Sequence, residues 1–183
     1  DLFVRTVADT VQRAAREAGF PLPLLGLEPG RSIVGPAGIA VYRVGAIKEI
    51  PGVRRYVSVD GGMADNIRPA LYGARYTAAL ANRDGPADSV VTIAGKYCES
   101  GDVLVSDATL PEPRPGDVVA IAAAGAYCLA MASNYNLALR PAVVLVREGQ
   151  ARLLQRRERI EDILQREVGA EESSESLAAV ELP

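Results

Sequence analysis

A cysteine and a glutamate stand side by side, as Cys98 and Glu99, in the stretch GKYCESGD of residues 95–102. A free thiol has an ordinary pKa of about 8.5 and can donate a proton, while a neighbouring carboxylate stays ionised and can bind an ammonium group. Because the chain contains no histidine, a cysteine–histidine nucleophile cannot be assembled within this segment. The pair predicts a proton donor beside a substrate-binding anion on an accessible loop; the competing interpretation is a small buried cysteine next to a solvated glutamate.

The tetrapeptide EPGR, formed by Glu28, Pro29, Gly30 and Arg31, follows a compact apolar run. If that run is a buried strand of an α/β fold, the tetrapeptide lies at the carboxyl end of the strand, where functional groups collect. Glycine lets backbone N–H groups approach an anion, and arginine can clamp a carboxylate or a phosphate with two donors. The pattern indicates an anion site, and the alternative is a turn with a surface arginine.

Residues 60–72, DGGMADNIRPALY, place Arg68 and Tyr72 four positions apart. The two glycines permit a tight turn after a strand, and Pro69 is a favoured first residue of a helix. Within a helical turn, a spacing of four sends both side chains toward the same side. We expect Arg68 and Tyr72 to lie together; the alternative is a glycine hairpin with a structural tyrosine.

The stretch GAYCLAMASNYN, residues 125–136, places Tyr127 directly after a small Gly-Ala pair. Residues 134–136 cluster hydrogen-bonding groups on a loop, whereas the small and apolar residues 130–132 suit core packing. Tyr127 is therefore the candidate site residue of this stretch.

The first element that must position these residues is an amphipathic helix. Apolar residues recur at spacings of three and four through residues 3–18, with charged and polar residues on the other side, and Gly19 ends the pattern. The apolar run LLGLEPG, residues 24–30, then has the character of a buried strand ending in a loop. A helix followed by a buried strand suggests the final unit of an α/β fold.

From Ile39 onward, short β-branched runs alternate with turn clusters such as DGG and PEPRPGD, which predicts an antiparallel β domain. Helical turns are expected at residues 69–74 and 124–134, and helical spacing returns in RRERIEDILQRE, residues 156–167. The polar and acidic residues 169–183 predict a flexible tail. The strand runs are IAVYRVGAI, RRYVSVD, SVVTIAG, DVLVSD, DVVAIAA and AVVLVRE.

Composition narrows the class of protein. A net charge of -3 over 183 residues, with 20 scattered basic residues, argues against nucleic-acid binding. No apolar run is long enough to span a bilayer and no secretory signal is present, so we expect a cytoplasmic protein without membrane contact. Two cysteines without histidine predict free thiols and no metal site. Because the chain begins at Asp1 and enters a helical pattern at once, we expect it to be part of a longer protein.

In this order, EPGR, DGGMADNIRPALY, CESGD and GAY with SNYN resemble the diaminopimelate decarboxylases, of the alanine-racemase-like class of pyridoxal 5′-phosphate (PLP) enzymes. The resemblance runs from about residue 1 to residue 167 and covers the C-terminal part of such an enzyme. It implies that residues 1–35 are the last helix and strand of a PLP-binding (β/α)8 barrel, most of which lies upstream. Residues 36–168 would form an antiparallel β-sandwich or Greek-key barrel domain with short helices.

The resemblance also implies roles for the candidate residues. PLP would be bound by five of them: Glu28, Pro29, Gly30, Arg31 and Tyr127. Arg31 and Tyr127 would also contact the substrate, together with Arg68, Tyr72 and Glu99. Cys98 would be the proton donor.

The implied reaction converts meso-2,6-diaminopimelate into L-lysine and carbon dioxide, in a homodimer whose active sites are shared. Cys98 and Glu99 of each subunit would reach the active site of the partner. Arginines would bind the remote carboxylate of the substrate, and Glu99 would bind its remote ammonium group.

Several positions depart from the family pattern. Neither Lys48 nor Lys96 follows a first barrel strand, so the lysine that holds the cofactor is missing, as is the histidine that stacks on the PLP ring. We therefore expect this chain alone to be inactive. Cys128 stands where a smaller residue is expected, and Ala138 stands where the family often has a second arginine.

Three alternatives remain open from the sequence. The parent enzyme could decarboxylate ornithine, arginine or carboxynorspermidine, although a glutamate after the cysteine matches a substrate with a second amino-acid end. A non-catalytic regulatory paralogue would keep the dimer surface without binding cofactor. The third alternative is a β interaction domain whose motif matches arise by chance.

Overall fold

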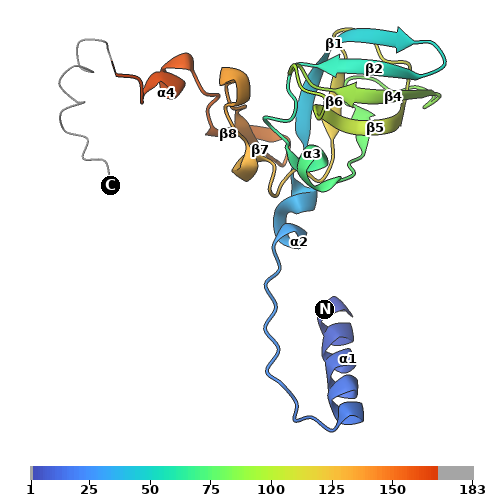
Figure 1. The fold of residues 1–183 in the computed structure, drawn as a ribbon, viewed down its shortest axis with the longest axis vertical. Coiled ribbons are helices and arrows are strands. Elements are labelled where there is room, and N and C mark those ends of the chain that lie inside the picture. Colours follow the sequence, from blue (N-terminus) through green and yellow to red (C-terminus); the bar gives the residue numbers. More distant parts are fainter. Residues whose placement is uncertain (1, 169–183) are drawn as a thin grey trace.

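The computed structural model describes residues 2–168, beginning with helix α1, Leu2–Ala18. The helix ends where Gly19 takes a left-handed conformation, with φ of +68°, which only glycine adopts without steric cost. None of its residues is buried, and Figure 1 shows it apart from the sheet, joined to it by an extended segment. The helix predicted over residues 3–18 is confirmed.

The buried strand predicted at residues 24–30 does not form. Residues 20–30 have no regular secondary structure, and Leu24, Leu25 and Leu27 are exposed. A buried strand requires neighbouring strands that pair with its N–H and C=O groups, and this segment pairs with none of the strands in residues 2–168. The chain becomes regular again in the short helix α2, Arg31–Val34, and the 3-10 turn η1, Gly35–Ala37.

Six strands form the main sheet, in the order β3-β6-β1-β2-β4-β5. Each run predicted within this sheet forms a strand; the three-residue β3 was not predicted. The strands are β1 (Ala40–Ile50), β2 (Arg54–Val59), β3 (Ala78–Leu80), β4 (Ser89–Ala94), β5 (Val103–Leu110) and β6 (Val118–Ile121).

The sheet is mixed, which corrects the prediction of an antiparallel domain. β2 and β4 run parallel, with Tyr56 opposite Thr92, while all other neighbours in the sheet are antiparallel. Parallel neighbours need a long crossover connection. Residues 60–88 supply it, and this crossover contains helix α3, Arg68–Tyr72, and strand β3.

The sheet curls until its two edge strands approach each other. β3 and β5 are in contact without pairing as neighbours, so the architecture is a nearly closed barrel formed by one sheet (Figure 1). Its interior is filled by apolar side chains, as the alternating pattern of the strands requires. The fully buried members include Val44, Val57, Val91, Ile93, Leu104, Leu110, Val119 and Ile121.

Edge strand β5 is interrupted by a β-bulge. Val91 pairs with Ala108 and Ile93 with Val105, so Ser106 and Asp107 together face the single residue Thr92. Asp107 takes a left-handed conformation, with φ of +53°. The extra residue bends the edge strand and increases its twist.

A second sheet consists of the hairpin β7–β8, Val143–Arg147 and Gln150–Gln155, beside the barrel (Figure 1). Its two-residue turn places Glu148 and Gly149 at positive φ, as the tightest hairpin turns require. The predicted helical turns correspond to α3, to the 3-10 turn η2 at Leu129–Met131 and to helix α4, Ile160–Leu164; a further 3-10 turn, η3, spans Tyr135–Leu137. The predicted tail, residues 169–183, lies outside the described residues.

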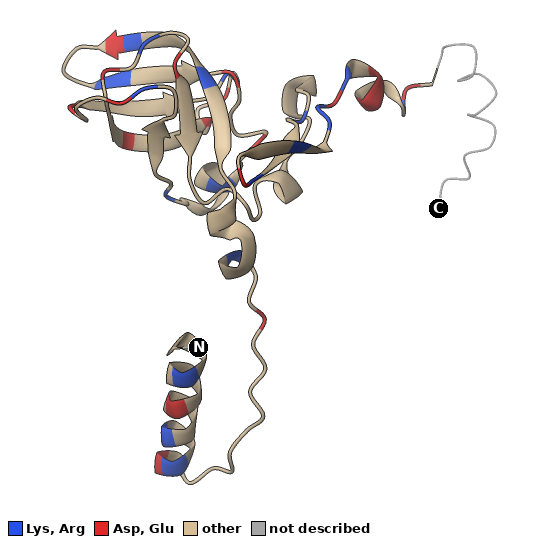
Figure 2. Ribbon diagram, turned by 180° about the vertical axis from the view of Figure 1, so that it is seen from behind, with Lys and Arg blue, Asp and Glu red and all other residues tan. Residues whose placement is uncertain are grey.

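Charged residues of both signs are interspersed over the structure (Figure 2). Within residues 2–168, no helix has the length and apolar character needed to cross a membrane.

One buried carboxylate, Asp117, ties together the loops before β4 and β6. Arg83 donates to both of its oxygens at 2.8–3.2 Å, and Asn82 and the Arg114 backbone N–H also donate to it. These donors, Arg83 above all, hold the pKa of the Asp117 carboxyl well below its usual range. The ionised form is therefore part of the folded structure.

We expect Asp117→Asn to lower the unfolding temperature of the full-length protein at pH 7 by roughly 5 °C, because charge-assisted hydrogen bonds are lost. Since folding lowers the pKa of Asp117, its contribution is complete above an ordinary carboxyl pKa of about 4 and disappears as the pH falls through the folded value. Thermal melts of both proteins from pH 7 to pH 2 should show the difference shrinking below about pH 4. A constant difference across this range would contradict the assignment.

Candidate active site

Arg68 and Tyr72 lie on the same side of α3, as their spacing predicts. The helix begins at Arg68, has Pro69 in its first turn and ends at Gly73, whose φ is +59°. The central carbon of the Arg68 guanidinium lies 5.1 Å from the centre of the Tyr72 ring, within the range of a cation–π contact. The alternative of a glycine hairpin with a structural tyrosine is excluded, because Tyr72 is exposed.

Tyr127, from a different part of the chain, contacts Arg68 as well. Its ring centre lies 5.5 Å from the Arg68 guanidinium carbon, so Arg68 contacts two tyrosine rings. Tyr127 takes a left-handed backbone conformation, with φ of +61°, which is uncommon for a bulky residue and is often found at functional sites.

The EPGR stretch also reaches this cluster. A methyl group on Gly30 would collide with the Tyr127 hydroxyl, and the aliphatic part of Arg31 lies against Gly35. Three of the four predicted stretches, EPGR, residues 60–72 and the GAY turn, therefore meet around Arg68 and Tyr127.

Two glycines hold the GAY turn in place. A side chain on either Gly38 or Gly125 would collide with the backbone of the other segment. The close approach allows Ala124 N–H to donate to the Gly38 carbonyl at 2.8 Å and Gly125 N–H to donate to the Gly35 carbonyl at 3.1 Å. Tyr127 follows this contact by two residues, so its position depends on it.

Cys128, the residue after Tyr127, is buried and holds the GAY turn against the interior. Its side chain is 5% exposed, and its Sγ lies 3.6 Å from the hydroxyl of Tyr76. The thiol, larger than the residue expected here, is accommodated in the interior. Tyr76 was missed by the sequence analysis because nothing in the isolated stretch GARYTAA marks a partner 52 positions away.

Cys98 and Glu99 lie in the connection between β4 and β5, and both are exposed. The prediction of an accessible loop is confirmed, and the interpretation as a buried cysteine is wrong. The Glu99 carboxylate accepts hydrogen bonds from the Ser100 hydroxyl and the Gly101 N–H, both at 3.3 Å. Within residues 2–168, neither residue bonds to the Arg68 cluster.

The loop of Cys98 nevertheless touches the elements that carry the cluster. Lys96 N–H donates to the Gly61 carbonyl at 3.0 Å, in the turn that precedes α3. The Tyr97 ring packs edge-on against Tyr135, with ring centres 5.6 Å apart. Nearby, Asn134 donates to the Glu158 carboxylate at 2.6 Å, which fixes the SNYN loop.

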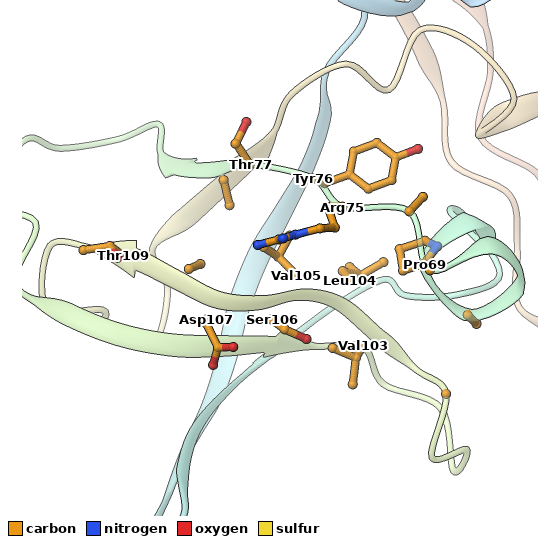
Figure 3. A pocket seen from close by; sticks show the side chains of 16 residues that line it. Pro69, Arg75, Tyr76, Thr77, Val103, Leu104, Val105, Ser106, Asp107 and Thr109 are labelled. Atoms are coloured by element: carbon orange, nitrogen blue, oxygen red, sulfur yellow. The ribbon is translucent and has the colours of Figure 1, made fainter.

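A cavity of about 680 Å³ lies between β5 and the segment that follows α3 (Figure 3). Tyr76 and Arg75 line one side, and Ser106 and Asp107 of β5 line the other. None of the predicted site residues lines it. The predicted site residues therefore lie outside this cavity, which marks the gap between the two edges of the sheet.

The donor set around Arg68 and Gly30 suits an anion. Arg31, Arg68 and the Tyr127 hydroxyl are all hydrogen-bond donors, and the Arg68 Nε–H is buried without a partner. Such a set fits a phosphate or carboxylate group.

The two lysines named in the sequence analysis lie elsewhere. Lys48 lies within β1, and Lys96 lies over the Tyr97 ring, 5.7 Å from its centre.

Comparison with known proteins identifies related sequences. Residues 6–125 match the family described as pyridoxal-dependent decarboxylase, C-terminal sheet domain. A diaminopimelate decarboxylase of Bacillus subtilis is 55% identical over 163 residues, which are 88% of this chain and 37% of the relative. One from Synechocystis is 49% identical over 166 residues, which are 90% of this chain and 35% of the relative. The chain thus spans little more than a third of these relatives.

A solved structure shares the fold. The diaminopimelate decarboxylase from M. jannaschii in complex with L-lysine is 38% identical, with a TM-score of 0.77 over 87% of this chain and 36% of that protein.

We expect Gly125→Ala to destabilise the full-length protein by about 2 kcal/mol or more, because the added methyl group must displace backbone atoms. The matched control is Gly45→Ala, whose methyl group would meet only the Ser58 carbonyl at an ordinary 3.7 Å. Denaturant unfolding of both variants measures the difference. Equal stabilities would show that the close approach of Gly38 and Gly125 does not constrain the Tyr127 turn.

Proposed function

Because the chain belongs to the pyridoxal-dependent decarboxylase family, whose C-terminal sheet domain it contains, we propose that it is the C-terminal part of a diaminopimelate decarboxylase. The whole enzyme would convert meso-2,6-diaminopimelate into L-lysine and carbon dioxide. The observation that carries this proposal is the convergence of EPGR, Arg68, Tyr72 and Tyr127 on one place, with Cys98 and Glu99 exposed on a loop tied to the same crossover.

Pyridoxal 5′-phosphate fits the donor set of this cluster. Glu28 to Arg31 would hold its phosphate end, and Tyr127 would lie near both cofactor and substrate, with Gly30 leaving room for the Tyr127 hydroxyl. When bound, the cofactor supplies an electron sink for the charge left on carbon as carbon dioxide departs. The lysine that holds the cofactor would come from a barrel upstream of this chain.

The remaining residues would bind and orient the substrate. Arg31 and Arg68 carry the positive charges that suit the remote carboxylate, and the Arg68 guanidinium contacts the rings of both Tyr72 and Tyr127. Glu99 supplies the negative charge for the remote ammonium group. Matching both charges selects a substrate with a second amino-acid end over ornithine or arginine.

Cys98 would return a proton to the carbon from which carbon dioxide has departed. Its thiol is exposed on the loop between β4 and β5, which suits delivery into the active site of a partner subunit. The enzyme would therefore act as a homodimer in which each site combines Arg68, Tyr72 and Tyr127 of one subunit with Cys98 and Glu99 of the other.

We expect Cys98→Ala to lower kcat of the full-length enzyme on meso-diaminopimelate by about 10²- to 10⁴-fold, the range typical of a lost general acid. The unfolding temperature and the absorbance of bound cofactor should stay unchanged, because the side chain is exposed and is not expected to hold PLP. Carbon dioxide release measures turnover. Unchanged kcat would show that Cys98 is not the proton donor. A wild-type enzyme that prefers ornithine would show that the substrate is another basic amino acid.

A shared site predicts complementation between two inactive variants. Mixing Cys98→Ala subunits with Arg68→Gln subunits should restore about a quarter of the wild-type turnover, because half of randomly mixed dimers are heterodimers and each has one intact site of two. Each variant alone, treated identically, is the control. No recovery, with heterodimers detected by native mass measurement, would place Cys98 and Arg68 of one subunit in the same site.

A further inference from the structure

Asp102, the last residue of GKYCESGD, is a buried carboxylate to which the proposed reaction assigns no role. Its side chain is 3% exposed, and within residues 2–168 it forms no salt bridge. Burying an unpaired carboxylate is costly unless hydrogen bonds satisfy its oxygens. The contacts that offset this cost therefore indicate what the residue does.

The two oxygens of Asp102 accept hydrogen bonds from two different loops. Oδ1 accepts the backbone N–H of Met63 at 2.6 Å, and Oδ2 accepts the backbone N–H of Tyr97 at 2.8 Å. The backbone of Asp102 also closes its own loop, since its N–H donates to the Glu99 carbonyl at 3.1 Å and its carbonyl accepts the Gly95 N–H at 2.9 Å. The side chain thus joins the loop of Cys98 to the turn before α3.

Two glycines make room for this carboxylate. A methyl group on Gly62 or on Gly95 would collide with its oxygens. Both glycines stand in the motifs that carry the candidate site, DGGMADNIRPALY and GKYCESGD. The close fit leaves the carboxylate little freedom to shift, so the two loops are held in one relative position.

The geometry requires a carboxylate in particular. Each N–H donor needs its own acceptor oxygen, and an asparagine would offer one oxygen and one NH₂ group, which would face an N–H. A glutamate is one methylene longer, and the close approach of Gly62 and Gly95 leaves little space for the extra group. Burial raises the pKa of the Asp102 carboxyl, while the hydrogen bonds from Tyr97 and Met63 act in the opposite direction by stabilising the ionised form.

We propose that Asp102 is a positioning residue, which fixes the loop of Cys98 and Glu99 to the crossover of its own subunit and so sets where Cys98 lies in the active site shared with the partner. The inference rests on the proposed function. Proton return depends on the distance between the donor and the reacting carbon, and a displacement of about 1 Å can lower a rate about 10²-fold. Asp102 acts on the reaction through Cys98.

A second buried carboxylate provides the matched control. Asp117 is 5% exposed and accepts hydrogen bonds from Arg83, Asn82 and the Arg114 N–H. These bonds join loops that carry none of the proposed site residues. Asp117→Asn and Asp102→Asn therefore remove the same chemical group from equally buried positions, but only the second change releases the loop of Cys98.

The test is a double-mutant cycle in the full-length enzyme with PLP bound. Asp102→Asn should lower kcat on meso-diaminopimelate about 10- to 100-fold, whereas Asp117→Asn should leave kcat unchanged below its unfolding temperature. In the Cys98→Ala background, Asp102→Asn should have little further effect on kcat, because proton return acts through Cys98, whereas a displaced Glu99 would change KM. An equal loss in both backgrounds would overturn the proposal and make Asp102 a general structural residue.

A second measurement does not depend on activity. The rate at which iodoacetamide alkylates Cys98, followed by peptide mass analysis, should change at least threefold in Asp102→Asn and remain the same in Asp117→Asn. Unchanged alkylation in Asp102→Asn would refute the positioning role. If the wild-type enzyme does not act on meso-diaminopimelate, the proposed function fails, while alkylation still decides the role of Asp102. If the Asp102→Asn variant does not fold, the same measurements are made on Asp102→Ser, whose side chain is smaller.

Discussion

The contact of the Arg68 guanidinium with two tyrosine rings is the interaction on which the candidate site depends. One ring, Tyr72, is fixed by the helical spacing of α3, and the other, Tyr127, is brought from a turn more than fifty residues later. Arginine suits this place because its planar, weakly hydrated cation can stack on aromatic faces and still direct its N–H groups at an anion. The close contacts of Gly30 and of Gly38 with Gly125 hold the turn of Tyr127 beside the other two side chains.

The second ring, that of Tyr127, is held by a backbone conformation that is uncommon for a bulky residue. Tyr127 adopts a left-handed conformation, and such conformations persist only where the surroundings fix them. The surroundings here are the contact between Gly38 and Gly125 on one side and the buried Cys128, near Tyr76, on the other. Backbone strain, close glycine contact and buried thiol therefore form one structural unit.

Much of this arrangement could be predicted from local sequence signals. The spacing of Arg68, Pro69 and Tyr72 determines a helical turn, and the β-branched runs determine most of the strands. The parallel pairing of β2 with β4 could not be predicted, because it depends on how residues 60–88 cross the sheet. The segment at residues 24–30 has the composition of a buried strand, yet composition cannot supply the neighbouring strands that such a segment requires. No role for Asp102 was predicted, because its side chain bonds to two backbone N–H groups, which the sequence does not reveal.

The bulge at Ser106 and Asp107 has a consequence beyond the shape of the barrel. An unpaired strand at the margin of a sheet is a template on which other chains can add strands and grow into fibres. The left-handed Asp107 breaks the regular row of N–H and C=O groups along β5 and places a charged side chain beside it, so a flat incoming strand finds no continuous register. The bulge therefore makes the open side of the barrel a poorer template for the addition of another strand.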